Sequence, residues 1–184
     1  MGSILEAYDS QKNFPVFGFG GIPRTMGSTV VSHCFPINFN PQDARIAGIQ
    51  NIVATYKMNL PQVGLGGPTL FAPLLTEFKT LVEGHMQRRT KIYSTLLIMS
   101  DGAIHDMPKT RELVWELSFM PCSIIIVGIG GADFSAMDEL DGDGGTLKNL
   151  KGEPCARDIV QFVVFNEAMA RGDLAEQVLK EVPL

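Results

Sequence analysis

The sequence predicts an α/β protein with a three-layer, doubly wound, mainly parallel sheet and helices on both faces. Apolar strand-like runs alternate with amphipathic helical stretches along the chain, which is typical of right-handed parallel crossovers. The strand-like runs are continuously apolar rather than alternating, which indicates a sheet covered on both faces. At 184 residues, 45% of them hydrophobic, the chain fits a single domain over residues 1–184.

The elements of the first half are short and separated by glycine and proline. Pro61 ends a stretch of apolar residues at helical spacing, because proline cannot continue a helix. A glycine-rich loop then runs over Gly64–Thr69. The elements predicted before it are a helix tail at Ile4–Tyr8, a strand at Phe14–Phe19, a strand at Val30–Phe39 and a helical stripe within Asp43–Leu60.

The second half has longer and clearer elements. Its strands are predicted from uninterrupted apolar, β-branched runs and its helices from apolar residues at helical spacing. The predicted strands are Ser94–Ser100, Ser123–Gly128 and Ile159–Phe165. The predicted helices are Phe71–Glu83, Lys109–Phe119, Ala132–Leu140 and Leu174–Val182.

Charge and composition narrow the possible functions. Fifteen Lys and Arg against 20 Asp and Glu give a net charge of −5, which argues against nucleic-acid binding because phosphate contacts need clustered basic side chains. The longest apolar run, Cys122–Ile129, is far shorter than the ~20 residues of a membrane-spanning helix, and we expect no secretory signal. Three cysteines without a CxxC pair indicate free thiols and a cytoplasmic protein. Residues 1–3 are interpreted as a cloning scar.

In an open parallel sheet the ligand site lies at the carboxyl ends of the strands. Asp101 directly follows an apolar strand, where a carboxylate can bind a divalent cation, cap a helix or terminate the strand. Thr69 precedes a helix, so its hydroxyl is either an ordinary N-cap or faces a metal. Asp106 precedes Pro108 and the next helix, where the N-cap interpretation is favoured. His105 lies four residues beyond Asp101 and is the only histidine near this position.

Together these residues resemble the metal-ion-dependent adhesion site of von Willebrand factor A domains, a family with a Rossmann-type fold. That site combines an Asp-x-Ser-x-Ser loop, a Thr from a later loop and an Asp after the fourth strand. Gly67-Pro68-Thr69 matches the Thr loop, and Ser100-Asp101-Gly102 matches the Asp. Hard oxygen ligands of this kind suit Mg²⁺ or Mn²⁺. The resemblance implies Thr69 and Asp101 as metal ligands, with Ser100, Gly67, His105 and Asp106 around them.

The resemblance narrows to the A domain of copines, and it covers nearly the whole chain in the family's order. The matching segments are Phe14-Pro15, Gly18-Phe19-Gly20, Asn38-Phe39-Asn40-Pro41, Gly48-Ile49-Gln50, Leu60-Pro61-Gln62-Val63, the GPT-x-FAP run of Gly67–Pro73, Val127–Phe134 and Ala156–Phe162. Plant RING-type ubiquitin ligases carry a related domain, but the last two segments are more similar to copines proper.

One departure limits the metal site. No Asp-x-Ser-x-Ser or Asp-x-Thr-x-Ser loop precedes Phe14, so the chain is interpreted as truncated before its helix tail, without the family's central first strand. Thr69 and Asp101 alone are expected to hold Mg²⁺ or Mn²⁺ weakly. Either the sheet closes over the missing strand or another chain fills the gap.

An EF-hand register over Glu139, Asp141 and Asp143 places Leu150 where a bidentate Glu is required, which favours an acidic surface turn over a calcium loop.

The resemblance implies a protein-interaction module and not an enzyme. Copines join two calcium-dependent phospholipid-binding C2 domains to this A domain, which recruits intracellular partner proteins. Calcium and membrane binding would then belong to the C2 domains, which recruit the parent protein from the cytoplasm to phospholipid membranes. The alternatives are the A domain of a copine-like RING ubiquitin ligase and a weak kinase-like activity, although the chain has no glycine loop followed by Lys that would hold a nucleotide.

Overall fold

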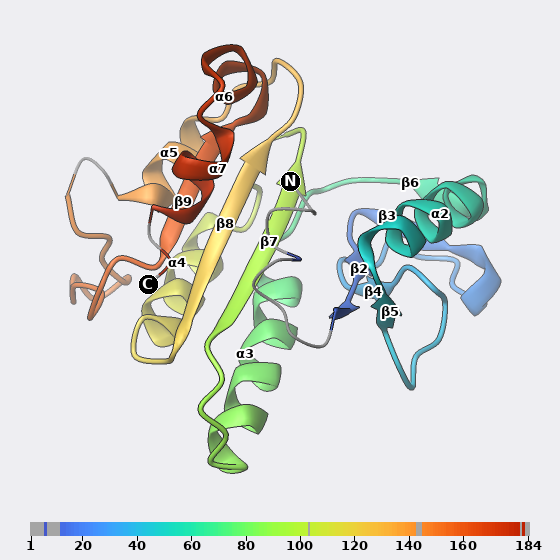
Figure 1. Cartoon of the computed structure of the whole chain (residues 1–184), viewed down its shortest axis with the longest axis horizontal. Helices are drawn as coiled ribbons and strands as arrows, with labels where there is room; N and C mark the ends of the chain where they lie inside the picture. The colour runs from blue at the N-terminus through green and yellow to red at the C-terminus, as the bar shows by residue number, and fades with distance from the viewer. Residues whose placement is uncertain (1–5, 7–11, 103, 143–144, 181, 183–184) are drawn as a thin grey trace. The chain divides into compact units, whose positions relative to one another are not determined.

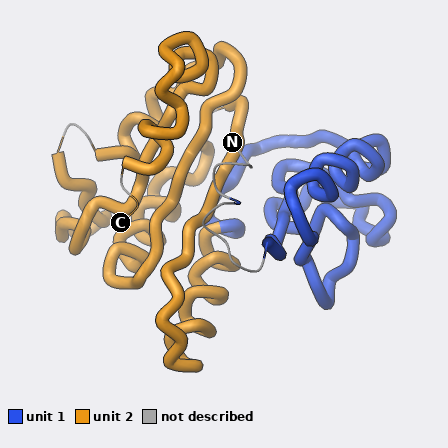
Figure 2. The backbone as a smooth tube through the Cα atoms, viewed as in Figure 1, with its two compact units in different colours: residues 1–74 blue, residues 75–184 orange. Residues whose placement is uncertain are grey.

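The computed structural model describes residues 6, 12–102, 104–142, 145–180 and 182. The chain divides into two compact units, residues 1–74 and residues 75–184 (Figure 2). The helix tail predicted at Ile4–Tyr8 lies, apart from Glu6, outside the described residues. None of the helices in the described ranges combines the length and the apolar character needed to cross a lipid bilayer.

The second unit is built on a parallel sheet of three strands in the order β7-β8-β9 (Figure 1). These strands are β7 (Ser94–Ser100), β8 (Cys122–Gly128) and β9 (Val160–Val164). Leu97 is paired with Ile125, and Ile125 with Gln161. Every residue of β8 is buried, as a continuously apolar central strand requires. The predicted α/β class, with a parallel sheet flanked by helices as in the von Willebrand A and Rossmann-type folds, is confirmed.

Three helices cover one face of this sheet: α3 (Ala72–Gln87), α4 (Met107–Leu117) and α5 (Ser135–Asp141). Lys79 Nζ of α3 lies 2.7 Å from Glu116 Oε2 of α4, and the carboxylate raises the pKa of the lysine. Arg111 Nη1 of α4 lies 3.4 Å from Glu139 Oε1 of α5. The three helices therefore lie side by side, joined by ion pairs along their outer surfaces.

The opposite face is covered at β9 by the last helix, α7 (Leu174–Leu179), which Figure 1 shows in front of the strand. Val178 of α7 is fully buried. A further helix, α6 (Phe165–Arg171), connects β9 to α7. Helix α6 was not predicted, because it begins directly after the strand with no side-chain cap and its first residue, Phe165, continues the apolar run.

β7 departs from the prediction that both faces of every strand are covered. Ile98 and Ser100 are buried, whereas Thr95 and Met99 on the other face are exposed, Met99 to 54%. Among the described residues β7 pairs with β8 alone, so it is an edge strand of its sheet.

The first unit consists of small antiparallel ladders beside one helix. Three two-stranded ladders hold it together, with register pairs such as Phe14 with Ile46 and Ile22 with Gly64. The ladders are β1 (Asn13–Pro15) with β5 (Arg45–Ala47), β2 (Phe17–Gly18) with β4 (Phe35–Pro36), and β3 (Gly21–Pro23) with β6 (Val63–Leu65). The helix is α2 (Ile49–Asn59), and two 3-10 turns occupy Arg24–Met26 and Leu60–Gln62.

Several predictions for the first unit were wrong in detail. The strand predicted at Phe14–Phe19 is split between two ladders, and only Phe35–Pro36 of the strand predicted at Val30–Phe39 is a strand. Val63–Leu65, predicted in part as loop, is β6. The helical stripe begins at Ile49 rather than near Asp43. Side-chain oxygens of Asn38, Asn40 and Asp43 accept backbone N–H groups two residues ahead, which favours turns over helix.

Candidate functional site

Asp101 lies at the carboxyl end of β7, where the fold predicts a ligand site. Ser100 is buried, and its carbonyl accepts a hydrogen bond of 2.9 Å from the backbone N–H of Ile129. This bond extends the pairing of β7 and β8 to their carboxyl ends. Because successive residues of a strand point to opposite faces, the residue after buried Ser100 points outward. Asp101 is exposed accordingly, on a backbone fixed by the sheet.

The segment after Asp101 leads into α4. Asp106 immediately precedes α4, and its Oδ1 accepts a hydrogen bond of 3.3 Å from Thr110 Oγ1. Its carbonyl accepts the N–H of Thr110 at 3.0 Å, the first bond of the helix. Asp106 therefore starts the helix, as predicted, although its carboxylate bonds a side chain rather than a backbone N–H. His105 beside it is exposed.

The carboxyl end of β8 adds a second loop to the same edge of the sheet. A Cβ on Gly128 would lie 3.0 Å from the ring of Phe134 and 3.1 Å from that of Phe162, so any larger residue here must displace these rings. Ile129 beyond it is 42% exposed. Asn166 Nδ2 of α6 donates to the carbonyl of Gly130 at 3.3 Å, which ties this loop to the start of α6.

Asp133 is a carboxylate at this edge that the sequence analysis did not assign to the site. It is exposed, and its Oδ1 accepts the backbone N–H of Ser135 at 3.0 Å. That hydrogen bond lowers the pKa of the Asp133 carboxyl. The signal was present in the sequence, since Asp133 follows a strand and two glycines and lies two residues before a serine. Its carboxylate stabilises the beginning of α5.

Thr69 and Gly67 belong to the first unit. The Gly67–Pro68 peptide bond is cis, and Thr69 lies three residues before Ala72, where α3 begins. Thr69 therefore lies in the loop that leads into α3, and both interpretations of its hydroxyl, a helix cap or a metal ligand, stay predictions. Phe71 anchors the loop, with its ring edge-on to that of Phe19 at 5.8 Å between centroids. Of the predicted residues, Ser100, Asp101, His105 and Asp106 lie in the second unit, between the end of β7 and the start of α4, whereas Thr69 and Gly67 lie in the first unit.

The donor set at β7 does not by itself amount to a metal centre. In the described ranges, no group of three or more His, Cys, Asp or Glu side chains is arranged to hold a metal ion. Asp101 offers one carboxylate, and the carboxylate of Asp133 already accepts the backbone N–H of Ser135 at the start of α5. A cation held at Asp101 needs further oxygen ligands, because Mg²⁺ requires near-octahedral coordination.

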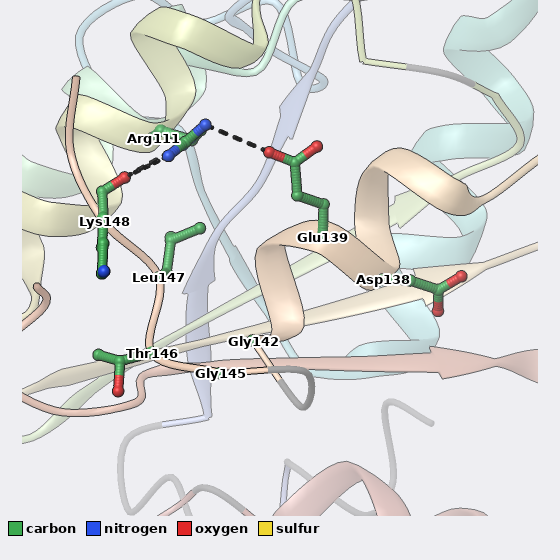
Figure 3. Close-up of a pocket in the computed structure, with 8 residues that line it drawn as sticks. All are labelled: Arg111, Asp138, Glu139, Gly142, Gly145, Thr146, Leu147 and Lys148. Carbon is green, nitrogen blue, oxygen red and sulfur yellow. Dashed lines mark hydrogen bonds and ion pairs between the residues drawn. The ribbon is translucent and has the colours of Figure 1, made fainter. Parts of the chain in front are cut away.

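The end of α5 borders a pocket of about 320 Å³ between α4, α5 and residues 145–148 (Figure 3). Arg111 spans it, donating to the carbonyl of Lys148 at 2.7 and 3.1 Å and to Glu139 at 3.4 Å. Asp141 is buried and accepts the backbone N–H of Phe162 at 2.9 Å. Glu139 and Asp141 thus lie in helix α5 and bond within the fold, so the prediction of a surface turn was wrong for these two residues. Asp143 lies outside the described residues.

The comparison with known protein families agrees with this architecture. The family model described as Copine matches residues 1–184, the whole length of the chain. The match covers both compact units, including the Gly67–Thr69 loop and the carboxyl ends of β7 and β8. The chain therefore belongs to the copine family.

Proposed function

We propose that the chain is a protein-binding module of a copine and that partners dock on the carboxyl end of β7 and β8. The observation that carries the proposal is the exposed carboxylate of Asp101, which follows buried Ser100 at the tip of a strand. A charged group on a rigid strand end loses little conformational freedom when a partner binds. Exposed Ile129 on the adjacent loop supplies apolar contact area next to the charge.

The chemistry of the partner follows from the two features of this surface, the charge of Asp101 and the apolar side chain of Ile129. A Lys or Arg of the partner can pair with Asp101 directly, while an apolar side chain of the partner packs against Ile129. In the finer form of the proposal, Asp101 and Thr69 share Mg²⁺ or Mn²⁺ with an acidic side chain of the partner, whose oxygens complete the coordination. The partners are intracellular proteins rather than nucleic acids, since the chain carries a net charge of −5.

We also propose that membrane attachment belongs to other domains of the parent protein. A membrane-surface helix combines a large apolar face with Lys and Arg on its polar face. The second unit, residues 75–184, carries 11 Lys and Arg against 17 Asp and Glu, a balance that repels anionic lipid headgroups. Calcium-dependent binding to phospholipid and recruitment from the cytoplasm are accordingly assigned to C2 domains of the parent copine.

The test compares two aspartates in the parent protein. Partners are captured with the parent copine and their affinities are measured by calorimetry for the wild type, Asp101→Ala and Asp138→Ala. Asp138 is an exposed residue of α5 and serves as the matched control. We expect Asp101→Ala to weaken binding about tenfold or more and Asp138→Ala to leave it unchanged. Equal effects of the two substitutions would contradict the proposed surface.

The cation is tested separately, by repeating the titrations with Mn²⁺ and with a chelator. Loss of binding with the chelator, together with loss in Thr69→Ala, supports the shared-metal form. If neither the chelator nor Thr69→Ala changes the affinity while Asp101→Ala still abolishes binding, the result supports direct pairing with a basic side chain of the partner and rejects the metal.

A further inference from the structure

The outer side of α4 carries two neighbouring aromatic side chains. Leu113, Val114 and Leu117 are buried and hold the inner side of the helix against the sheet. Trp115 lies on the opposite side, and Phe119 follows two residues beyond the end of the helix. The two rings form an edge-on pair with 5.1 Å between their centroids, and Phe119 is 60% exposed. Large aromatic side chains presented together in this way are typical of the centre of a binding surface.

The indole of Trp115 is held in place by a segment of the chain that contains a proline. Its Nε1 donates to the carbonyl of Pro154 at 3.1 Å. Pro154 pairs with Lys148 in an isolated antiparallel bridge, and the backbone N–H of Ala156 donates to Ser118 Oγ at 2.9 Å. An extended, proline-containing backbone therefore already lies beside the indole. Because these bonds fix the ring in advance, a partner loses little binding energy in ordering it.

We propose that Trp115 and Phe119 bind a proline-rich segment of a partner protein, with Lys or Arg between its prolines. Such segments adopt the polyproline II conformation, which has no internal hydrogen bonds, and they are recognised by neighbouring aromatic side chains. The N–H of Trp115 is already used by Pro154. Recognition of the partner therefore rests on contacts of its proline rings with the ring of Phe119 and the face of the indole.

Carboxylates beside the two rings explain why the partner segment should be basic. Glu112 lies three residues before Trp115, and Glu153 directly precedes Pro154. Each accepts a hydrogen bond from residues 149–150, and neither forms an ion pair within the described ranges. The second unit has 11 Lys and Arg against 17 Asp and Glu, a net charge of −6. This charge attracts a basic segment and disfavours a phospholipid surface at the same rings.

The test is a titration of the purified chain with synthetic peptides, followed by the fluorescence of Trp115, the only tryptophan. The probe is a short peptide of Arg-Pro-Pro repeats. One control peptide has Arg-Ala-Ala repeats and keeps the charge without proline, and the other has Glu-Pro-Pro repeats and reverses the charge. We expect a dissociation constant on the order of 100 µM for the probe and binding about tenfold weaker or more for each control.

Three variants locate the binding surface. Phe119→Ala removes the more exposed ring and should weaken binding of the probe about fivefold or more. Met169→Ala is the matched control, since Met169 on α6 is 55% exposed, close to the 60% of Phe119, and it should leave the affinity unchanged. Asp101→Ala should also leave it unchanged, because Asp101 lies at the carboxyl end of β7. Circular dichroism verifies that each variant is folded.

Four results would overturn the proposal. The first is the absence of binding of the Arg-Pro-Pro peptide up to about 1 mM, and the second is equally tight binding of the Arg-Ala-Ala peptide. The third is an unchanged affinity in Phe119→Ala. The fourth is a different occupant of the two rings: either a dimer in sedimentation equilibrium that Phe119→Ala dissociates, or binding to phosphatidylserine vesicles that Phe119→Ala abolishes.

Discussion

Arg157 joins the amino-terminal ends of the sheet strands, and its removal should destabilise the second unit. Its Nη2 donates to the carbonyls of Met120 and Cys122 at 2.6 and 2.5 Å, and its Nη1 donates to Tyr93 Oη at 3.1 Å. Tyr93 Oη in turn lies 2.6 Å from Ser123 Oγ of β8. One guanidinium thus fixes the residues that enter β7 and β8.

The magnitude follows from these three bonds. A hydrogen bond to a charged group contributes about 1.5–3 kcal/mol. Arg157 is half-buried, so water replaces part of what is lost, and we expect Arg157→Ala to lower the free energy of unfolding by about 3 kcal/mol. For a chain of this size that corresponds to a decrease in Tm of about 6–12 °C. Urea denaturation followed by the fluorescence of Trp115 on α4 measures it in the second unit.

Arg45→Ala is the matched control. Arg45 forms a 2.8 Å ion pair with Asp43 on the surface of the first unit, with both side chains largely in solvent. Exposed pairs of this kind contribute little, so we expect almost no change in the unfolding of either unit. The interpretation fails if Arg157→Ala leaves the unfolding free energy within about 0.5 kcal/mol of wild type, or if the two alanine variants are equally destabilised.

Three further predictions concern packing, thiol reactivity and acid stability. Gly128→Ala forces a methyl group against two phenylalanine rings and should cost about 1–3 kcal/mol in chemical denaturation; an unchanged midpoint would show that the rings move freely. Burial raises the pKa of Cys122 to about 11, so iodoacetamide at pH 8 should modify half-buried Cys34 about a hundredfold faster, and equal rates by mass spectrometry would refute this. Arg45 lowers the pKa of Asp43 to about 2, so any contribution of the pair to stability is present above pH 4 and lost as the pH falls through about 2; because both side chains are exposed, that contribution should be small, so wild type and Asp43→Asn should give nearly parallel acid denaturation curves, and a much smaller acid loss in Asp43→Asn would contradict this.

The second unit was largely predictable because its strands are long and apolar. STLLIMS forms the strand Ser94–Ser100 as predicted, and the run after Pro121 forms the fully buried β8. The exposure of Met99 was not predictable. An apolar residue in a central strand and one in an edge strand look alike in sequence, and only the pairing of β7 distinguishes them.

The first unit was less predictable, because its ladders are two or three residues long and leave no periodic pattern. Turn chemistry decides its structure instead. Gly48 has a φ of 75°, which glycine adopts at little cost, and α2 begins directly after it. The apolar spacing from Ile46 onward favours helix, but Ile46 is paired with Phe14 in a ladder. Tertiary pairing overrides the helical pattern there.

The candidate site was predicted in part. The sequence identified Asp101 as the tip of a strand and Asp106 as the start of a helix, because both positions are fixed by neighbouring residues. Thr69 lies in the loop before α3, and the helix-capping interpretation of its hydroxyl stays a prediction. Whether Thr69 and Asp101 share a cation depends on side chains of two separate units, which no local pattern specifies.

The central claim is that partners of this copine dock at the carboxyl ends of β7 and β8. Hydrogen exchange of the parent protein with and without a captured partner tests it most directly. We predict slower exchange in residues 101–106 and 129–134 on binding, with little change in residues 145–151, which contact Arg111 and Glu112 of α4. Protection confined to residues 145–151, with none at Asp101 or Ile129, would contradict the claim.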